Sequence, residues 1–375
     1  MKKILRFIAL AVVLTALFSA CQNGGVHVHS DPEPSSTPTQ TPSVSVVTPT
    51  PVTPTPVTPT PVTPTPVTPT PVTPTPVTPT PVTPTPVTPT PVTPTPVDPD
   101  KTRPEDYEPF YPTEKVVAFT FDDGPCWVTP QILDVLEGTG DKVTFFIVGE
   151  MMDKNKKDYP AYVKRAYDMG CDIGSHTENH QTLTKLSDTE LAEQLGRNQA
   201  RFNEITGDNM YLMRPPGGSL DRNRKYGYAS VIWSLDSDDW EIYGRINKNY
   251  KNIFGNEGAF KNPHSETYEK AAKEVVDELV ANVLKKVQPG DIVLMHDIYF
   301  TSARAFKEIY TALKAQGYRF VTVSEMLNIN AAEYDGWYFF STRAAGHDNK
   351  TYYAKKPASA PAFALALLPN KEDED

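Results

Sequence analysis

The stretch Val116–Pro125, which reads VVAFTFDDGP, decides the fold of this 375-residue chain. The residues of Val116–Phe121 are β-branched, aromatic or small and uncharged, as in a parallel strand that is buried on both faces. A Gly-Pro pair then stops the strand directly after Asp122 and Asp123. Two adjacent carboxylates therefore stand at the carboxyl end of a buried strand, where α/β sheets and barrels collect their chemistry. A purely structural turn is the alternative at this point, because Asp-Asp-Gly-Pro also suits an Asx-type turn.

The amino-terminal segment has the features of an export signal. Residues Met1–Ala20 begin with basic residues, continue with an apolar run and end in Ser-Ala directly before Cys21. This order predicts a secretory signal peptide, and the apolar run is too short for a comfortable membrane span. The cysteine after the small pair resembles a bacterial lipoprotein cleavage site, although Phe18 stands where a smaller aliphatic residue is usual. We expect Cys21 to become the lipidated first residue, with plain secretion as the alternative. No other segment is long and apolar enough to span a bilayer.

A proline-rich repeat follows the signal. From Thr48 to Val97 the chain repeats the unit Pro-Val-Thr-Pro-Thr, without charged or aromatic residues. Proline fixes φ and removes backbone donors, so this segment cannot form helix or sheet. We expect residues 21–102 to be disordered, with the repeat as a semi-rigid polyproline II rod of roughly 150 Å. Such a rod would hold a folded domain away from the membrane, and a passive linker is the alternative.

Charge and cysteine content limit the possible partners. The net charge of -10 and the pI near 5.3 argue against nucleic acid as a partner. Apart from Cys21, the chain has only Cys126 and Cys171, which we expect to be unpaired, partly buried thiols, although a secreted protein could pair them. We expect the chain to be monomeric.

A folded domain is expected over residues 103–330, followed by a carboxyl-terminal extension, 331–375. Strand-like and helix-like runs alternate in this domain, which predicts a parallel sheet with helical crossovers. The expected strands are 116–121, 142–149, 171–175, 210–214, 229–236, 291–296 and 319–322, and the expected helices are 159–170, 187–205, 267–287 and 302–316. About seven strands favour a complete or distorted (β/α) barrel, with an open doubly wound sheet as the alternative. We expect 241–266 to be a loop beside the cleft, and the aromatic residues of the tail to pack back on the domain.

Two histidines follow the third expected strand. His176 and His180 are four residues apart in SHTENH, a spacing that places both on one face of a helical turn and presents two imidazoles to one metal ion. Together with a strand-end aspartate they make a three-ligand set, which leaves positions for water and substrate. This is the pattern of a catalytic site for zinc or a similar divalent ion.

Three further polar clusters fall at the same end of the expected sheet. Arg214 begins RPPGG, and an arginine at a strand end can pair with a carboxylate and keep it ionised. The cluster Asp236–Trp240 supplies acids and an aromatic face. His296 follows an apolar strand, and a histidine in this position can act as a general acid near neutral pH.

In this order, TFDDGP, SHTENH, RPPGG, DSDDW and LMH resemble the five motifs of the polysaccharide deacetylases, the NodB-homology group known as carbohydrate esterase family 4. The resemblance covers roughly residues 115–327 and implies a distorted (β/α) barrel. It also implies roles for individual residues. Asp122 would be the general base, and Asp123, His176 and His180 would be the metal ligands.

The other motifs carry further implied roles. Arg214 would orient and tune the base, and the backbone N–H of Gly217 would help to bind the oxyanion. Many relatives have an aromatic residue at this position, so Gly217 removes one wall of the sugar site. Asp239 would tune the catalytic acid, His296. Two residues would line the acetyl pocket: Trp240 and Leu294.

The resemblance implies a metal-dependent hydrolase that removes N-acetyl groups from N-acetylglucosamine-type residues of a polysaccharide. We expect zinc as the cofactor, with cobalt or another divalent ion as alternatives. The anchor and stalk favour cell-wall peptidoglycan as the substrate and predict an exported membrane lipoprotein that faces the wall. The alternatives are an O-acetyl esterase acting on xylan or another polysaccharide, a chitooligosaccharide deacetylase, and a non-catalytic carbohydrate-binding surface protein. The last would require a missing ligand or base, and none is missing.

Overall fold

The computed structural model describes residues 107–108, 114–341 and 352–355, with gaps at 154, 157, 222–223, 225, 255–259 and 261–264. The expected signal peptide, Cys21 and the proline-rich repeat lie outside these described residues. Among the described helices, none combines the length and the apolar character needed to cross a membrane.

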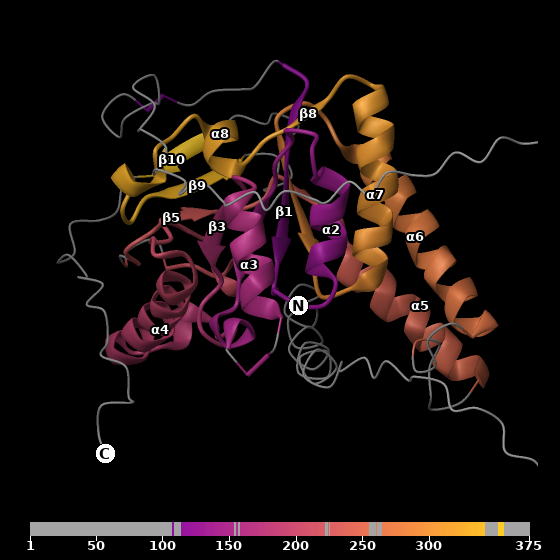
Figure 1. Ribbon diagram of the computed structural model, residues 1–375, viewed down its shortest axis with the longest axis horizontal. Helices are drawn as coiled ribbons and strands as arrows, with labels where there is room; N and C mark the ends of the chain where they lie inside the picture. Colours follow the sequence, from indigo (N-terminus) through magenta and orange to yellow (C-terminus); the bar gives the residue numbers. More distant parts are fainter. Residues whose placement is uncertain are drawn as a thin grey trace, which may run out of the picture. The chain divides into compact units, whose positions relative to one another are not determined.

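Strands and helices alternate along the described chain, as the sequence predicts (Figure 1). In chain order the elements are β1 (Val116–Asp122), α2 (Thr129–Leu136), β2 (Thr144–Ile147), η2 (Gly149–Met152), α3 (Tyr159–Asp168), β3 (Asp172–Ser175), η3 (Leu183–Lys185), α4 (Asp188–Thr206), β4 (Leu212–Met213), η4 (Pro216–Gly218), β5 (Ala229–Val231), β6 (Leu235–Asp236), α5 (Asp239–Phe254), α6 (Glu266–Lys286), β7 (Asp291–His296), α7 (Phe300–Ala315), β8 (Arg319–Phe320), α8 (Val323–Leu327), η5 (Ala331–Glu333), β9 (Tyr338–Ser341) and β10 (Tyr352–Lys355).

The ten strands of the described residues form one curled sheet. Their order is β10-β9-β5-β4-β3-β2-β1-β7-β6, with β8 also paired to β1, and all pairs except β9 with β10 are parallel. Only residues 232–234 separate β5 from β6, although β6 ends the sheet and β5 lies toward the opposite edge. Because so short a connection spans at most about 14 Å, the sheet must curl until these two parts approach. The expected distorted (β/α) barrel is therefore confirmed.

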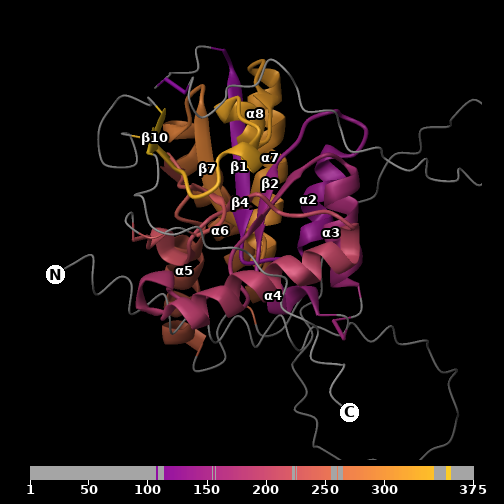
Figure 2. The ribbon, with the colours of Figure 1, turned by 90° about the vertical axis from the view of Figure 1, so that its left-hand side faces the viewer.

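β1 lies in the middle of this sheet and is buried along its whole length. Val117, Phe119 and Phe121 belong to the larger core cluster, which contains most of the buried side chains of the surrounding helices. Val116 and Ala118 belong to a second cluster, which joins side chains of several strands with those of α8. Both faces of β1 are thus covered, which explains why its sequence carries no charge before Asp122. Figure 2 shows α4 running along the lower end of the view, toward which β1 leads.

The stretch 241–266, which we expected to be a loop, is helical over much of its length. Helix α5 begins at Asp239 and continues to Phe254, and α6 begins at Glu266. Its core face includes Ile242, Tyr243 and Ile246, which are spaced three to four residues apart and are at most 9% exposed. The loop expectation was wrong because the Asn, Lys and Gly residues between these positions hide a helical pattern.

Two strand expectations are also corrected. The run 229–236 is not one strand but two, β5 and β6, which pair with different neighbours. The strand expected over 319–322 ends at Phe320. The side chain of Thr322 instead accepts a hydrogen bond from the backbone N–H of Glu325 and caps α8.

Two smaller expectations are confirmed. The aromatic residues of the tail pack back on the domain, since Tyr334 and Phe339 are fully buried and β9 pairs with β5. Cys126 and Cys171 are buried and form no disulfide.

Candidate active site

The first feature of the site is an ion pair at the carboxyl end of β1. The Nη1 atom of Arg214 lies 2.8 Å from Oδ1 of Asp122, and both side chains are almost completely buried. The guanidinium also lies over the ring of Phe146, 4.2 Å from its centre, and Nε donates to the Val231 carbonyl oxygen. These contacts fix the orientation of Arg214, and the ion pair fixes that of Asp122.

Thr120 completes this arrangement, and the sequence analysis did not single it out. Its Oγ1 atom accepts a hydrogen bond from Arg214 Nη1 at 2.6 Å and donates one to the Val293 carbonyl oxygen at 2.7 Å. Alternate residues of a strand share one face, so Thr120 and Asp122 point to the same side of β1. That alternation was the signal in the sequence that could have identified Thr120.

The structure brings Asp123, His176 and His180 together at the ends of β1 and β3. Oδ1 of Asp123 lies 3.3 Å from Nε2 of His176 and 3.3 Å from Nε2 of His180. Nδ1 of His176 lies 2.7 Å from the Arg214 carbonyl oxygen, which directs Nε2 toward the carboxylate. Burial lowers the pKa of His180, which favours the neutral imidazole that a metal ligand requires.

The surroundings of Asp123 fit a bound cation. Its side chain is 1% exposed, and neither of its carboxylate oxygens accepts a hydrogen bond from the described residues. Burial alone would raise the pKa of Asp123, but His180 and His176 lower it well below its ordinary value. One carboxylate and two imidazoles have ligand atoms within 4.8 Å of one another, which is a donor set suited to a divalent metal ion.

The turn between the two histidines is not the helical turn expected from their spacing. It follows β3 directly, and Thr177 and His180 have φ angles of 68° and 60°. Positive φ is rare for residues other than glycine and is least favourable for β-branched ones such as Thr177. The two imidazoles still meet, with ring centres 5.0 Å apart, because the turn reverses the chain between them.

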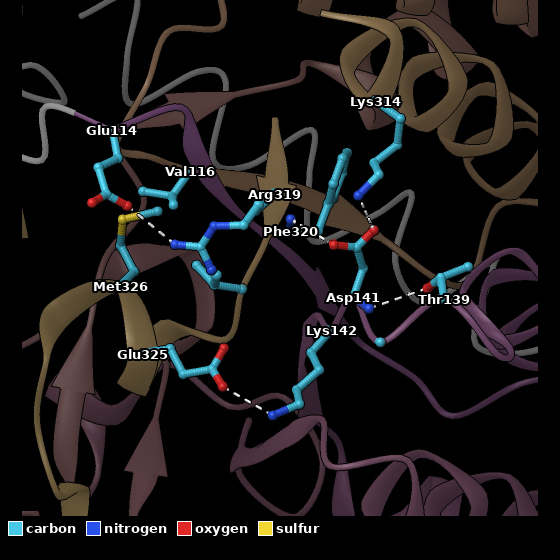
Figure 3. A pocket seen from close by; sticks show the side chains of 12 residues that line it. Glu114, Val116, Thr139, Asp141, Lys142, Lys314, Arg319, Phe320, Glu325 and Met326 are labelled. Carbon is cyan, nitrogen blue, oxygen red and sulfur yellow. Dashed lines mark hydrogen bonds and ion pairs between the residues drawn. The ribbon is translucent and has the colours of Figure 1, made fainter. Parts of the chain in front are cut away.

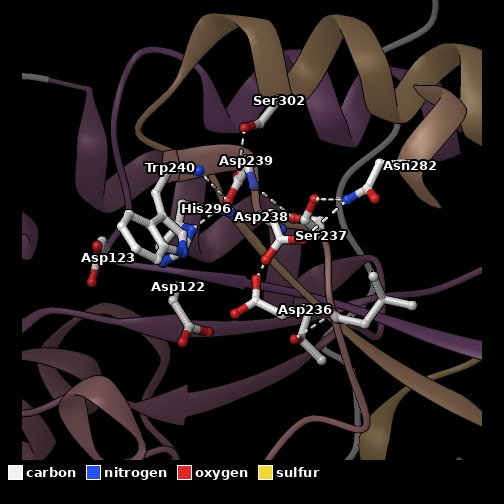
Figure 4. Close-up of polar contacts among 12 residues, drawn as sticks. Asp122, Asp123, Asp236, Ser237, Asp238, Asp239, Trp240, Asn282, His296 and Ser302 are labelled. Carbon is white, nitrogen blue, oxygen red and sulfur yellow. Dashed lines mark hydrogen bonds and ion pairs between the residues drawn. The ribbon is translucent and has the colours of Figure 1, made fainter. Parts of the chain in front are cut away.

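On the other side of the site, Asp239 holds His296 at the end of β7 (Figure 4). Oδ1 of Asp239 lies 2.8 Å from Nδ1 of His296, and Oδ2 accepts hydrogen bonds from the His296 backbone N–H and from Ser302 Oγ. Burial by itself lowers the pKa of His296, but the Asp239 carboxylate overrides this effect and raises the pKa to about 10. The register of the sheet places His296 directly beside Asp122 on β1.

The remaining predicted residues belong to the strand ends or to the segments that follow them. Trp240 donates its backbone N–H to Oδ1 of Asp239, the same oxygen that faces His296. Leu294 is buried on β7, two residues before His296 and on the same face of the strand. Gly217 lies in η4, just after the strand that ends near Arg214, with a φ of 61°.

Ser302 and Asp297 are further residues of this region that the sequence analysis did not assign. Ser302 lies in the first turn of α7, and nothing in its sequence context pointed to Asp239. Asp297 is fully buried, accepts a hydrogen bond from Thr129 Oγ1 at 2.5 Å, and lies against Gly124. Burial raises the pKa of Asp297 to about 7.

Comparison with known proteins identifies a family model, related sequences and a similar solved structure. The family model described as polysaccharide deacetylase matches residues 111–231. A peptidoglycan-N-acetylglucosamine deacetylase of Listeria monocytogenes is 34% identical over 217 residues, which cover 57% of this chain and 39% of that protein. A peptidoglycan-N-acetylglucosamine deacetylase of Bacillus cereus is 34% identical over 225 residues, which cover 57% of this chain and 89% of that protein. A solved structure of a peptidoglycan deacetylase from Bacillus subtilis is 32% identical and covers 58% of this chain and 92% of that one, with a TM-score of 0.45.

The extent of these matches differs between the relatives. The match spans only 39% of the length of the Listeria protein, so that relative has long regions without a counterpart in the alignment. The match spans nearly the whole of the Bacillus cereus protein, at 34% identity. The chain therefore belongs to the polysaccharide deacetylase family.

Proposed function

We propose that this chain is a metal-dependent hydrolase that removes N-acetyl groups from a cell-wall glycan, with peptidoglycan as the substrate. The observation that carries the proposal is the buried cluster of Asp123, His176 and His180 beside Asp122 on one strand and His296 on the next. Asp122, which is not part of the cluster, is thus available as a base, and His296 on the neighbouring strand is available as an acid. The names of the relatives from Listeria and Bacillus cereus support peptidoglycan as the substrate class.

Asp123, His176 and His180 would hold the metal ion. When bound, a divalent ion lowers the pKa of a water molecule and polarises the carbonyl group of the acetamide. We propose zinc, because two imidazoles and one carboxylate with open positions suit a catalytic zinc site. Cobalt and other divalent ions are the alternatives that a metal panel would separate.

Asp122 acts as the general base in this proposal. It accepts a proton from the water molecule whose oxygen forms a bond to the acetyl carbon. Arg214, itself held by Thr120 and Phe146, keeps the Asp122 carboxylate in one orientation throughout. The backbone N–H of Gly217 donates to the carbonyl oxygen as negative charge develops on it.

His296 acts as the general acid. The carbon–nitrogen bond breaks as the nitrogen takes a proton from His296, which is required because an amide anion is a very poor leaving group. Asp239 holds Nδ1 of His296, so Nε2 is the atom that delivers the proton. A pKa of about 10 keeps this histidine protonated at neutral pH. The products are acetate and an amino sugar.

We also propose that the domain works outside the cell on a lipid anchor. The features that support this are the basic start and apolar run of residues 1–20, the Ser-Ala pair before Cys21, and the proline-rich repeat within 21–102. In this proposal, 1–20 is a signal peptide, Cys21 is the lipidated residue and the repeat is a stalk. The catalytic domain would then comprise 103–330, with 331–375 as an extension that contributes β9 to its sheet. Metabolic labelling with a fatty acid, compared between the wild-type chain and Cys21→Ser, tests the anchor.

Acetate release from isolated wall material, with and without a chelator, tests the proposed activity. The same assay on acetylated xylan and on N-acetylglucosamine oligomers distinguishes an O-acetyl esterase and a chitooligosaccharide deacetylase from the proposed enzyme. Release from peptidoglycan that the chelator abolishes and zinc restores is the expected result. Sugar binding that the chelator leaves unchanged, without any acetate release, would instead identify a carbohydrate-binding protein.

A further inference from the structure

The turn that carries the two histidines is held from one side by helix α4. This helix is 19 residues long and begins with a capping box formed by Ser187 and Glu190. Three of its side chains, Gln194, Asn198 and Arg201, contact the residues that lie between His176 and His180. Because they are spaced four and three residues apart, they share one face of the helix. We call these three side chains the α4 clamp.

Asn198 lies at the centre of the α4 clamp. It is fully buried, and its Nδ2 atom donates hydrogen bonds to the carbonyl oxygens of Ile147 at 2.8 Å and Thr177 at 2.5 Å. The Ile147 carbonyl also accepts the backbone N–H of His176. The Asn198 amide group therefore ties the end of β2 to Thr177, and it shares the Ile147 carbonyl with the backbone N–H of His176.

The other two members contact the next two residues of the turn. Oε1 of Gln194 accepts the backbone N–H of Asn179 at 3.2 Å, and Nε of Arg201 donates to Oε1 of Glu178 at 3.1 Å. Each residue between the histidines thus has its own partner on α4. A Cβ atom at Gly149 would meet the Glu178 carboxylate and the Asn198 backbone, so the glycine allows η2 to pack closely against both the turn and α4.

The backbone of the turn explains why such support is needed. Thr177 and His180 adopt positive φ angles, which persist in a folded protein only where surrounding contacts fix them. The backbone N–H groups of Gly149 and Glu150 hold the carbonyl oxygens of Thr177 and Glu178 from the β2 side, and the α4 side chains complete the support from the other side. Loss of the α4 support should let the turn relax, so that the two Nε2 atoms are placed less accurately around Asp123. We propose that the α4 clamp is a positioning element that presets the spacing of His176 and His180 for the metal ion. The clamp residues touch neither metal nor substrate, and the inference rests on the proposed metal-dependent function.

Zinc affinity, measured in the full chain by competition with a chromophoric chelator, tests this inference without any substrate. Asn198→Ala is expected to weaken zinc binding by up to about 10-fold, the lower end of the loss that follows removal of a direct hydrogen-bond partner of a metal ligand, because Asn198 acts on the histidines through Ile147 and Thr177. Gln199→Ala is the matched control, because Gln199 is also a buried amide on α4 but holds Asn209 and Met210 rather than the turn. The control is expected to keep the zinc affinity of the wild-type chain.

A second pair of variants covers the case in which Asn198→Ala does not fold. Gln194→Met removes the acceptor for the Asn179 N–H and is expected to weaken zinc binding several-fold, whereas Gln194→Glu keeps an acceptor and is expected to restore it. The inference is overturned if Asn198→Ala or Gln194→Met binds zinc as the wild-type chain does, or if Gln199→Ala loses as much. Acetate release, assayed separately on the wild-type chain, reports on the proposed function. A wild-type chain that binds zinc but releases no acetate would refute the proposed function without contradicting the inference about the α4 clamp.

Discussion

Charged residues lie at both ends of the curled sheet, but they differ in their exposure to solvent. At the amino end of β1 lies a pocket with a volume of about 630 Å³ (Figure 3). Three ion pairs line it: Lys142–Glu325, Lys314–Asp141 and Arg319–Glu114. All of these side chains except that of Asp141, which is 8% exposed, are more than one third exposed, so most of the charges have both a partner and water.

At the carboxyl end the charges are buried. Asp122, Asp123, Arg214 and Asp239 are each at most 3% exposed, and the Asp123 carboxylate has no hydrogen-bond donor among the described residues. Burying a charge without sufficient partners is costly, so such a group indicates that something outside the chain completes it. The comparison teaches that a large pocket with many charges is weaker evidence of chemistry than one buried carboxylate that lacks a donor.

The largest effect expected from this contrast is at Asp123. Asp123→Ala should reduce acetate release from peptidoglycan to background, because it removes both a proposed metal ligand and the negative charge at the centre of the cluster. The chain should also lose zinc affinity in a chelator competition assay. Glu325→Ala, at the opposite end, is the matched control and should retain full activity. Equal activity of wild type and Asp123→Ala would refute the proposed site.

A smaller loss is expected from the two residues proposed for proton transfer, Asp122 and His296. Asp122→Asn and His296→Ala should each lower kcat by about 10²–10⁴-fold, the range typical of general acid–base groups. Unlike Asp123→Ala, both variants should still bind zinc, since neither residue belongs to the cluster of Asp123, His176 and His180. If either variant lost zinc binding as well as activity, that residue would be reassigned from proton transfer to metal binding.

The sequence predicted β1 and β7, the strands that end at Asp122 and His296, well and for a physical reason. The apolar run before Asp122 is uncharged because β1 is buried on both faces, and the polar residue types begin where that burial ends. The same reasoning applies to Leu294 and His296 on β7. Motifs at the carboxyl ends of parallel strands can therefore be predicted from sequence, because all of these strand ends lie at the same edge of the sheet.

Contacts between remote segments were not predictable in the same way. The run 229–236 is one apolar stretch in the sequence, and only the pairing of β5 with β4 and β9 and of β6 with β7 divides it. Asn198 is an ordinary polar residue within an amphipathic helix until the turn at Thr177 is folded against it. Ser302 likewise acquires its role only through Asp239, 63 residues earlier in the chain.

The pH dependence of the rate tests whether His296, held by Asp239 at the carboxyl end of the sheet, is the titrating acid. In the wild-type chain Asp239 raises the pKa of His296. The proposed mechanism uses the protonated form of His296, so the rate should fall as the pH rises through that pKa. Asp239→Asn removes the charge and lets the pKa of His296 fall toward its ordinary value of about 6.5. The alkaline limb of kcat/KM should therefore move to lower pH, with the variant nearest to wild type in acid. An unchanged alkaline limb would mean that His296 is not the titrating acid.

The smallest effects are expected at the amino-end pocket, and they test the comparison from its other side. Glu325→Gln and Lys142→Met each break an ion pair whose side chains are 38% and 35% exposed. Exposed pairs contribute about 0–1 kcal/mol, so thermal unfolding should shift only slightly, and zinc affinity and acetate release should not change. Because the Lys142–Glu325 charges are solvated in the folded chain, removing one leaves no buried charge without a partner. A large loss of activity in either variant would show that the amino end takes part in the reaction, and exposure would then be a poor guide to function in this sheet.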